Sequence, residues 1–523
     1  MGKAPFYITT PIYYVNDKPH LGHAYTTIAC DVLARFKRLD GHEVYFLTGT
    51  DEHGQKVAQA AEAAGIDPQK FTDQVSQNFR DLVPLLNFSN DDFIRTTEER
   101  HKKACYTLWK TLEEAGEIYL DKYSGWYAVR DEAYYGEEEL TDGPNGKKIA
   151  PSGAECEWVE EESYFFKLSA WQDRLLKFYD ENPDFILPES RRNEVISFVK
   201  GGLMDLSVSR TRMRWGVPVP GSDKHVMYVW IDALTNYLTG VGYPDIKNEN
   251  FKKFWPADIH VVGKDILRFH AVYWPAFLMA AKIATPKRIF AHGWWTIEGQ
   301  KMSKSIGNVI SPHDLVQRYG VDASRYFLLR EVPFGNDGDF SHSQAINRIN
   351  NDLANGLGNL AQRSLSFIYK NCEGKIPEAK NLTKEDHDLL NRVQTTMIEL
   401  VRNDLDRQRF HKALETIWIS VNEANFYIDK FAPWTLKKEG NTERMNTVLY
   451  VLTETIRCLG IAIQPFMPDS AAKFLDQIKI PEDQRSFEYL SSKHAIKSGI
   501  AIDAPQGIFP RIVEEGAAAK AAR

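Results

Sequence analysis

The sequence predicts an α/β fold in which a parallel sheet is split by an inserted domain and followed by an all-helical domain. Three observations support this prediction. Short apolar strands alternate with amphipathic helices in the first part of the chain, which is typical of a parallel sheet. The alternation stops between about Ile118 and Trp215 and then resumes. Beyond about residue 345 the apolar residues follow the helical period alone.

The first alternating elements begin close to the N-terminus. Residues 6–10 predict a strand, residues 22–38 an amphipathic helix, residues 43–47 the next strand and residues 53–64 the next helix. Successive β-α-β units bind ligands at the carboxyl ends of their strands. We therefore expect a ligand site at that edge of the sheet.

The interruption has a different composition from its surroundings. It contains clustered acidic residues, a Gly- and Pro-rich turn at residues 143–146, and the aromatic residues Trp126, Tyr127, Tyr134, Tyr135 and Trp158. We expect an inserted β-rich domain here. The alternation resumes with a buried strand at residues 258–263 and a helix at residues 266–281, so the nucleotide-binding type of sheet is interrupted rather than ended.

The last part of the chain shows apolar faces at helical spacing. One face contains Ile349, Leu353, Leu357 and Leu360, a second contains Leu390, Val393, Met397 and Leu400, and a third contains Leu449, Leu452, Ile456, Leu459 and Ile463. Several such helices with short connections predict a bundle.

The composition is that of an ordinary globular protein, with 43% hydrophobic and 26% charged residues. The net charge of −7 argues against a protein that coats nucleic acid by charge alone, although a local basic face can still bind RNA. The five scattered cysteines argue against a disulfide framework. Neither a membrane span nor a signal peptide is visible, and we expect a cytoplasmic protein that does not contact a membrane.

The most informative motif near the N-terminus is His20-Leu21-Gly22-His23. It follows the first strand and Pro19, which favours a helix start. The N–H groups of a helix N-terminus attract anions such as a triphosphate. Gly22 has no side chain, so a flat adenine or ribose could approach the backbone. The alternative is a pair of solvated or structural histidines.

A second motif, Lys301-Met302-Ser303-Lys304-Ser305, lies in a loop between Gly299 and Gly307. Its two lysines could neutralise charge that develops on a phosphate. The alternative is a solvated turn. Together and in this order, the two motifs resemble the ATP-handling signatures of class I aminoacyl-tRNA synthetases.

Further stretches make the resemblance specific to the methionyl-tRNA synthetase family. They are FYITTPIYYVN at 6–16, PHLGHAYTT at 19–27, GTDEHG at 49–54, YVWIDALTNY at 228–237, GKDILRFH at 263–270 and the Lys301 loop. The resemblance runs from residue 5 to about residue 470. It implies a Rossmann-type catalytic domain at 1–117 and 226–290, a connective, knuckle-like insertion at 118–225, a loop and stem-contact region at 291–345, an anticodon-binding domain at 346–505 and a tail at 506–523.

The resemblance also implies roles for individual residues. His20, His23, Lys301 and Lys304 are the expected catalytic residues, and the ATP site adds Gly22, Gly263 and Ser303. The expected methionine site comprises Ile12, Asp51, Trp230, Leu234, Tyr237, Asp265 and His270, with Asp51 at the ammonium group and Asp265 near it. The expected anticodon readers are Asn359, Arg363 and Trp434.

Structural alternatives exist for four of these residues. Trp230 and Tyr237 could be ordinary core residues, and Asp51 could cap the helix that follows it. Trp434, which follows Pro433, could pack at a helix start.

The resemblance further implies ATP with Mg²⁺, L-methionine and methionine tRNA, both initiator and elongator, as ligands. Many relatives carry zinc knuckles with Cys-x-x-Cys pairs in the insertion. This chain has no Cys-x-x-Cys, and Cys156 is the only cysteine between residues 106 and 371. Since structural zinc needs four ligands, we expect no zinc and an insertion held by Trp126, Tyr127, Tyr134 and Trp158. Some relatives dimerise through an extra C-terminal RNA-binding domain that does not follow the bundle here, and we therefore expect a monomer.

Three other functions remain open at this point. A class I synthetase for cysteine or leucine would need a thiol-selective zinc site or a large editing insertion. A nucleotidyltransferase would not need the helical domain. A non-catalytic RNA-binding relative would be expected to have lost the histidines and lysines of the two motifs.

Overall fold

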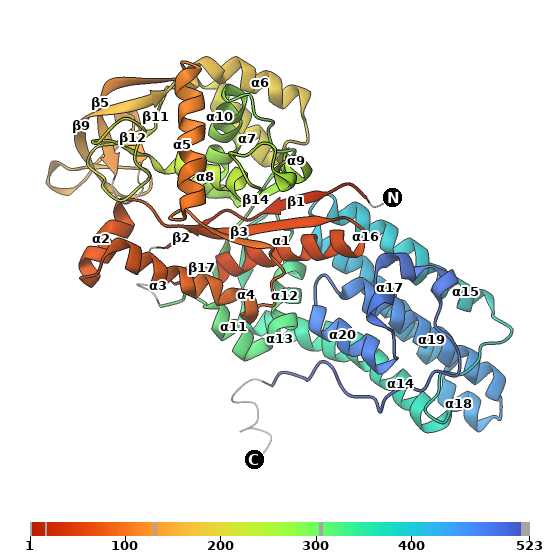
Figure 1. Ribbon diagram of the computed structural model, residues 1–523. Coiled ribbons are helices and arrows are strands. Elements are labelled where there is room, and N and C mark those ends of the chain that lie inside the picture. The colour runs from red at the N-terminus through yellow and green to blue at the C-terminus, as the bar shows by residue number, and fades with distance from the viewer. Residues whose placement is uncertain (1–2, 16–17, 129, 131–132, 303–306, 514–523) are drawn as a thin grey trace, which may run out of the picture.

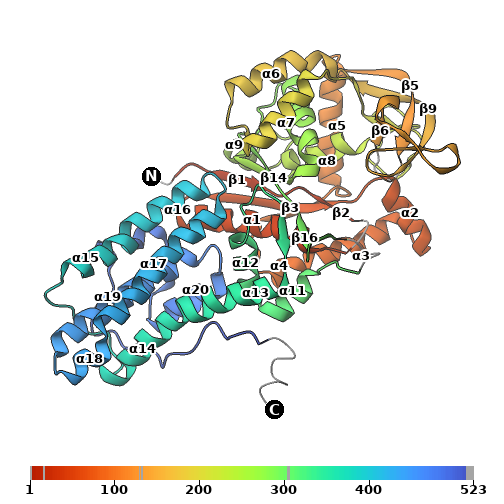
Figure 2. The same cartoon turned by 180° about the vertical axis from the view of Figure 1, so that it is seen from behind.

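The computed structural model describes residues 3–513 apart from 16–17, 129, 131–132 and 303–306. A parallel sheet lies at the centre of the molecule, the inserted antiparallel sheet lies at one end, and a long helical bundle extends from the other side (Figure 1). The view from behind shows the same arrangement (Figure 2).

The central sheet has seven strands in the order β10-β15-β14-β1-β3-β2, with β4 also paired to β3. All of these pairs are parallel. The strands are β1 (Phe6–Thr9), β2 (Tyr13–Tyr14), β3 (Val44–Asp51), β4 (Asp92–Arg95), β10 (Ile186–Leu187), β14 (Ile259–Gly263) and β15 (Ile289–His292). The predicted α/β class is confirmed.

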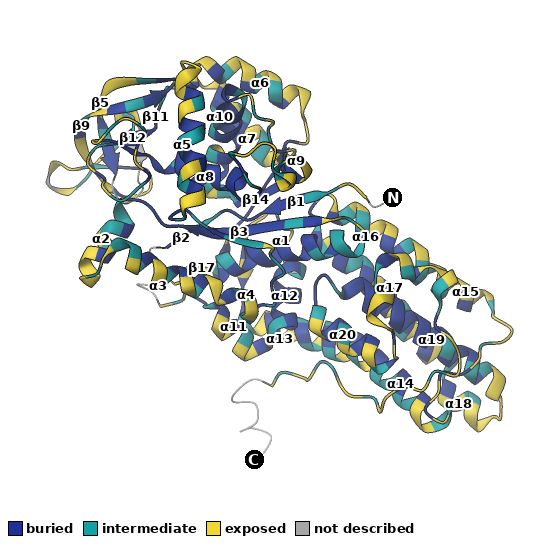
Figure 3. Ribbon diagram, viewed as in Figure 1, coloured by how far each residue is buried: buried dark blue, intermediate teal, exposed yellow. Residues whose placement is uncertain are grey.

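Alternate side chains of the strands face two different cores. Ile8, Phe46 and Val261 pack with α1 (Leu21–Leu39) in one core. Tyr7, Leu47 and Val262 pack in the other core, together with α5 (Glu99–Glu114), α8 (Val229–Thr239) and α10 (Trp274–Ala280). The period of two along each strand therefore buries both faces of the sheet, as the dark central band in Figure 3 shows.

Further helices of this half surround the sheet. They are α2 (Gln55–Ala64), α3 (Pro68–Arg80), α4 (Leu82–Leu85), α6 (Gln172–Glu181), α7 (Glu189–Lys200) and α9 (Glu249–Phe254). The single helix predicted at 266–281 is a π-helical turn, Phe269–Tyr273, that continues into α10. The wider turn brings His270 into the buried interior.

The inserted sheet is antiparallel, in the order β6-β5-β9-β8-β7, with β11 paired to β9. Its strands are β5 (Ile118–Ala128), β6 (Ala133–Tyr135), β7 (Thr141–Asp142), β8 (Lys148–Ile149), β9 (Glu155–Phe166) and β11 (Leu206–Ser207), and a separate pair joins β12 (Ser209–Arg210) to β13 (Val226–Met227). Trp126 and Trp158 meet edge to face at 5.4 Å, although Trp158 is 52% exposed. Cys156 packs with three alanines, and the side chain of Tyr134 lies outside the described part.

The predicted insertion at 118–225 is too wide, because part of it returns to the central sheet. Strand β10 pairs with β15, and the flanking helices α6 and α7 bury Leu175 and Val199 in the core of the central domain. A two-residue strand leaves no periodic signal in the sequence, which explains the error.

A three-stranded sheet links the central domain to the bundle. It consists of β16 (Trp295–Ile297), β17 (Gln300–Lys301) and β18 (Gly338–Phe340). Between β17 and β18 the chain forms α11 (Pro312–Tyr319) and α12 (Val321–Arg330), and α13 (His342–Arg348) follows β18. The loop that carries the second motif therefore begins on a β-strand.

The bundle begins with a π-helical stretch, Ile349–Gly358, which joins α13 to α14 (Asn359–Asn371). The other helices are α15 (Lys384–Asn391), a π-helical turn at Arg392–Thr396, α16 (Met397–Leu405), α17 (Phe410–Phe431), α18 (Pro433–Lys438), α19 (Thr442–Ile463) and α20 (Pro468–Gln477). Short 3-10 turns cover Glu137–Glu139, Pro144–Gly146, Leu168–Trp171, Lys264–Ile266, Glu482–Gln484, Phe487–Leu490 and Ser492–His494. The predicted bundle is confirmed.

One predicted apolar face is partly wrong. Leu400 is 43% exposed, because α16 turns Met397, Ile398, Val401 and Leu405 inward instead. Helix α19 is apolar and long enough to cross a membrane by length and composition alone, but 89% of its apolar window is buried in the protein. It is the central helix of the bundle.

The end of the described chain packs back on the bundle. Asn350 and Ile512 exchange two hydrogen bonds, Nδ2 to the carbonyl and the Ile512 N–H to Oδ1, both at 2.9 Å. Residues 506–513 of the predicted tail are therefore partly anchored, whereas residues 514–523 lie outside the described part.

Candidate functional site

Two histidines form the N-terminal cap of α1. The His20 Nδ1 atom accepts a hydrogen bond from the Gly22 N–H at 3.1 Å, and the His23 Nδ1 atom accepts one from the His20 N–H at 3.1 Å. Each Nδ1 is an acceptor, so a neutral ring carries its proton on Nε2. The histidines therefore cap the helix and still offer one N–H donor each.

Burial keeps both imidazoles neutral near pH 7. Desolvation lowers the pKa of His20 below its usual value of 6.5. Desolvation, followed by repulsion from His20, lowers the pKa of His23 well below that value. The two rings lie 3.9 Å apart between centroids, so adding charge to both would be unfavourable without an anion.

The structure gives a reason for glycine at position 22 that the sequence did not suggest. A Cβ atom at this position would lie 3.0 Å from Cε1 of His20, which is closer than ordinary contact. The absence of a side chain at Gly22 thus makes room for the capping ring. The approach of a ligand to the backbone stays a prediction.

A backbone hydrogen bond links the first motif to the segment that follows the second motif. The Leu21 N–H donates to the Ile310 carbonyl at 3.0 Å, and Ile310 follows the Gly299–Gly307 loop by three residues. The first turn of α1 is therefore adjacent to residue 310, which lies downstream of the second motif. Gly263 lies at the same edge, at the end of β14 and paired with His292, whose Nε2 is 2.8 Å from Oγ1 of Thr26 on α1.

Lys301 lies at the end of β17 with its ammonium 5.3 Å from the centre of the Trp294 ring. Lys264 lies 4.2 Å from the same ring and pairs with Asp337 at 2.6 Å. Such cation–π contacts hold lysines without removing their charge. Ser303 and Lys304 lie outside the described residues.

Asp265 belongs to the Lys301 side of the site. Its Oδ2 accepts a hydrogen bond from Trp294 Nε1 at 2.5 Å. Burial raises the pKa of Asp265, and the Trp294 bond, Lys264 and Lys301 partly offset that rise. The expected place of Asp265 near the methionine ammonium group stays a prediction.

Asp51 is the last residue of β3 and is buried. Helix α2 is capped by Gly54 without a side-chain hydrogen bond, so the capping alternative for Asp51 is wrong. Ile12 and Trp230 pack together against Tyr228, Val229 and Ala233. The carboxylate thus lies at the carboxyl edge of the sheet, where α/β folds bind ligands.

Helix α8 supplies the aromatic wall. The Trp230 ring stacks on Phe269 at a centroid distance of 3.4 Å and an angle of 15°. Leu234 and Tyr237 are buried in the core between α8 and the sheet. Core packing was the alternative for Trp230 and Tyr237. Trp230 is only partly buried, so it retains an accessible surface.

The Tyr237 hydroxyl has a defined partner. His270 Nδ1 lies 2.8 Å from the Ile266 carbonyl, which can only accept, so Nδ1 carries the proton. Burial lowers the pKa of His270 to about 4, which leaves Nε2 unprotonated. Tyr237 Oη therefore donates to His270 Nε2 at 2.6 Å, and the Tyr237 ring also stacks on His260 at 4.0 Å.

Several neighbours were missed from the sequence. Phe269, Trp294 and His292 contact predicted site residues directly. Trp294 and His292 lie shortly before the Lys301 motif, which was the available signal, whereas Phe269 was hidden inside the GKDILRFH stretch.

A second group lies at the far end of the bundle. Arg363 on α14 pairs with Asp429 on α17 at 2.6 Å, and its guanidinium lies 5.2 Å from the centre of the Trp434 ring. Asn359, one turn before Arg363, is exposed. Trp434 is 37% exposed on α18, while the preceding Pro433 is buried. The helix-start packing proposed as an alternative is therefore made by Pro433 rather than by Trp434.

Comparisons with known proteins cover nearly the whole chain. Residues 6–365 match the model of a family described as tRNA synthetases class I (M), and residues 376–523 match the anticodon binding domain of methionyl tRNA ligase. The methionine–tRNA ligase of Rickettsia bellii is 57% identical over 517 residues, covering 97% of this chain and 99% of its own length. The methionine–tRNA ligase of Mesorhizobium japonicum is 55% identical over 515 residues, covering 98% of this chain and 99% of its own length.

Solved structures agree with these sequence matches. Mycobacterium tuberculosis methionyl-tRNA synthetase in complex with methionyl-adenylate matches with a TM-score of 0.95 and 52% identity, over 97% of this chain and 100% of that chain. The apo form of the same protein matches with a TM-score of 0.89 and 48% identity, over 98% of this chain and 99% of that chain.

Proposed function

Because this chain belongs to the methionyl-tRNA synthetase family of class I tRNA synthetases, we propose that it activates L-methionine with ATP and transfers the methionyl group to the 3′ end of methionine tRNA. The observation that best supports the proposal is the backbone hydrogen bond from Leu21 to Ile310. It joins the start of α1, which carries the histidines, to the segment that follows the Lys301 motif. Through Thr26 and His292, α1 is also linked to the edge of the sheet where β14 ends at Gly263.

In the first step the methionine carboxylate attacks the α-phosphate of ATP, and methionyl-adenylate and diphosphate form. No enzyme nucleophile is required, because alignment and charge stabilisation suffice. The free Nε2–H groups of His20 and His23 donate to phosphate oxygens. Lys301, with Lys304 and Ser303 from the same motif, neutralises the charge of the transition state, and Gly22 and Gly263 leave room for the nucleotide. Mg²⁺ enters with ATP as part of the substrate.

Methionine needs a carboxylate for its ammonium group and an apolar enclosure for its thioether. Asp51 supplies the carboxylate. Ile12, Trp230, Leu234, Tyr237 and His270 form the enclosure, and the bond from Tyr237 to His270 fixes the orientation of the Tyr237 ring. Asp265 lies on the Lys301 side of the site, where it accepts a hydrogen bond from Trp294.

The second step requires a cognate tRNA. An unpaired anticodon base can stack on an exposed aromatic ring and bond to amide and guanidinium groups. Trp434, Arg363 and Asn359 offer that combination on adjoining helices. We propose that they read the anticodon of both initiator and elongator methionine tRNA.

The remaining proposals concern the state of the protein. We propose that it works in the cytoplasm, in keeping with five free cysteines, and that it is a monomer without zinc. Elemental analysis tests the absence of zinc, because one zinc ion per chain would contradict it. Sedimentation equilibrium tests the monomer.

ATP–diphosphate exchange across the twenty amino acids tests the function. We expect exchange with methionine only. Exchange with cysteine or leucine would indicate a different class I synthetase. Exchange with no amino acid would favour a nucleotidyltransferase or an RNA-binding protein.

A further inference from the structure

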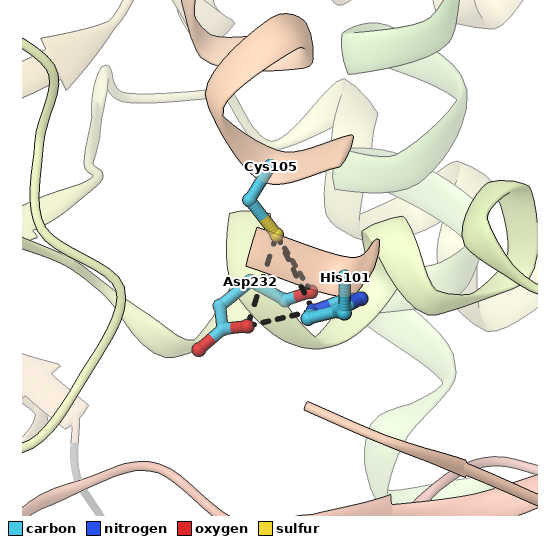
Figure 4. Close-up of side chains that lie close together, drawn as sticks. All are labelled: His101, Cys105 and Asp232. Atoms are coloured by element: carbon cyan, nitrogen blue, oxygen red, sulfur yellow. Dashed lines mark hydrogen bonds and ion pairs between the residues drawn. The ribbon is translucent and has the colours of Figure 1, made fainter. Parts of the chain in front are cut away.

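A cluster of buried polar side chains from α8, α5 and residue 53 has no role in the mechanism described above. Asp232 on α8 binds two histidines: Oδ2 lies 2.6 Å from Nδ1 of His53, and Oδ1 lies 2.8 Å from Nε2 of His101. Cys105 Sγ lies 3.3 Å from the same His101 nitrogen. Figure 4 shows His101 and Cys105 directed from α5 toward Asp232.

The cluster joins two elements of the proposed active site to α5. Asp232 lies in the same helix as Trp230, Leu234 and Tyr237. His53 follows Asp51 by two residues, and His101 lies on α5, one turn before Cys105. The bond from His53 to Asp232 therefore links the segment that follows Asp51 directly to the helix that carries the aromatic wall.

Other contacts also hold this segment. Glu52 is fully buried and accepts two hydrogen bonds from Arg95, at 2.7 and 2.9 Å. Trp215 donates to the Glu52 carbonyl at 2.6 Å. These contacts attach the segment to β4 and to residue 215, whereas His53 attaches it to α8.

The same atoms could in principle hold a metal ion, since His101, Cys105 and Asp232 offer ligand atoms within 4.8 Å of one another. Zinc binds the thiolate form of cysteine. Burial, followed by the charge of Asp232, raises the pKa of the Cys105 thiol well above its usual value. Moreover, each carboxylate oxygen already lies at hydrogen-bond distance from its own imidazole. The geometry favours a hydrogen-bond network.

We propose that Asp232 is a positioning residue for methionine binding, which acts by holding His53, and with it the Asp51 end of β3, at a fixed distance from Trp230 and Tyr237. The proposal rests on the proposed function. Hydrogen bonds between a buried carboxylate and two imidazoles fix the relative position of the three groups, which apolar packing does not do. Loss of the carboxylate should therefore separate the ammonium contact from the side-chain enclosure and leave the ATP side, on α1 and the Lys301 loop, in place.

The test uses the full-length chain in ATP–diphosphate exchange, with methionine and ATP varied separately and rates divided by the fraction of active sites. Asp232→Asn should raise the KM for methionine between about 10- and 100-fold, the size expected for a small misplacement. The KM for ATP should change by less than about twofold. A simple loss of folded protein would lower the active fraction and leave both KM values unchanged.

Asp386→Asn is the matched control. Asp386 is also a fully buried carboxylate, held by Arg444 and Tyr427, but it lies in the bundle. It should affect stability without changing the KM for methionine. If Asp232→Asn and Asp386→Asn gave the same kinetic pattern, the positioning role would be refuted.

A pair of His53 variants keeps the proposal testable if Asp232→Asn does not fold. His53→Asn retains a donor near the position of Nδ1, whereas His53→Leu does not. We expect His53→Leu to raise the KM for methionine and His53→Asn to restore it to within about threefold of the original value. Equal values for the two variants would overturn the proposal. If the unmodified chain showed no methionine-dependent exchange, the proposed function itself would fail, which is a different result.

Discussion

Arg325 and Asp31 form a fully buried ion pair, with 2.6 Å between Nη2 and Oδ2 and no exposed surface on either side chain. Asp31 lies in the middle of α1, the helix that His20 and His23 cap, and Arg325 lies on α12. Arg325 also donates to the carbonyls of Pro465 and Phe466 at 2.9 Å, where α19 has just ended. The pair therefore connects the proposed ATP helix to the helical bundle.

Removing one member of this pair should be strongly destabilising. Arg325→Met leaves the Asp31 carboxylate with fewer partners in the interior, which typically costs about 3–5 kcal/mol. We expect a clear drop in the midpoint of urea unfolding. The control is Lys479→Met, which removes a pair with Asp503 whose side chains are 46% and 56% exposed, and it should cost no more than about 1 kcal/mol. Equal losses in the free energy of unfolding for the two variants would contradict the role of Arg325 in connecting α1 to the bundle.

Stability should also fall on mild acidification. Burial lowers the pKa values of His270 and His292 from 6.5 to about 4. Between pH 6.5 and 4 the unfolded chain binds protons at these positions and the folded chain does not, so the free energy of unfolding decreases as the pH falls. Above pH 6.5 both states are neutral at these histidines, and they contribute no slope.

The expected slope is up to about 1.4 kcal/mol per pH unit for each histidine. Urea unfolding at pH 7.5, 6.5, 5.5 and 4.5 measures it. His292→Gln should reduce the slope in this window by close to one histidine's share. An unchanged slope in that variant would show that His292 does not titrate as described.

The sequence was most informative where one element carries its own signal. Residues 6–10, 22–38 and 258–263 match β1, α1 and β14 closely, because the periods of two and 3.6 reflect burial directly. The start of α1 shortly after Pro19 was also visible locally. The family resemblance then supplied site residues, among them Trp230 and Tyr237, that periodicity alone would have assigned to the core.

What could not be predicted depends on contacts between distant segments. The strand β10 lies inside the region that looked like an insertion, and its partner β15 is about a hundred residues later. The π-helical turn at Phe269–Tyr273 changes which side chains face inward. The bond from His53 to Asp232 spans 179 residues, and nothing near either residue indicates the other.

Lys301→Ala should separate chemistry from binding. The Lys301 ammonium lies over the Trp294 ring, which also donates to Asp265. Loss of one preorganised charge at a transition state typically costs about 100- to 1,000-fold in rate. We expect such a fall in adenylate formation, measured in a single turnover, while the KM for methionine changes by less than about threefold.

Lys264→Ala provides the comparison for Lys301. Lys264 lies over the same ring, but Asp337 already offsets its charge. Its removal should reduce adenylate formation by less than about tenfold. If both variants lowered the rate of adenylate formation by the same factor, proximity to Trp294 and not the charge of Lys301 would explain the effect.

Trp434→Ala should affect only the tRNA step. Its ring is 37% exposed, lies on α18 at the end of the bundle and is contacted by the Arg363 guanidinium at 5.2 Å. Stacking of one base on an aromatic side chain contributes about 1–3 kcal/mol, so kcat/KM for aminoacylation should fall by about 5- to 150-fold. Methionine-dependent ATP–diphosphate exchange should stay unchanged, because the α1 and Lys301 motifs lie on a different domain. Trp158→Ala removes another exposed tryptophan, 52% exposed on the inserted sheet, and should leave the anticodon dependence intact. Equal losses in exchange and aminoacylation for Trp434→Ala would mean that the bundle is required for adenylate formation, and the proposed division between the two domains would be wrong.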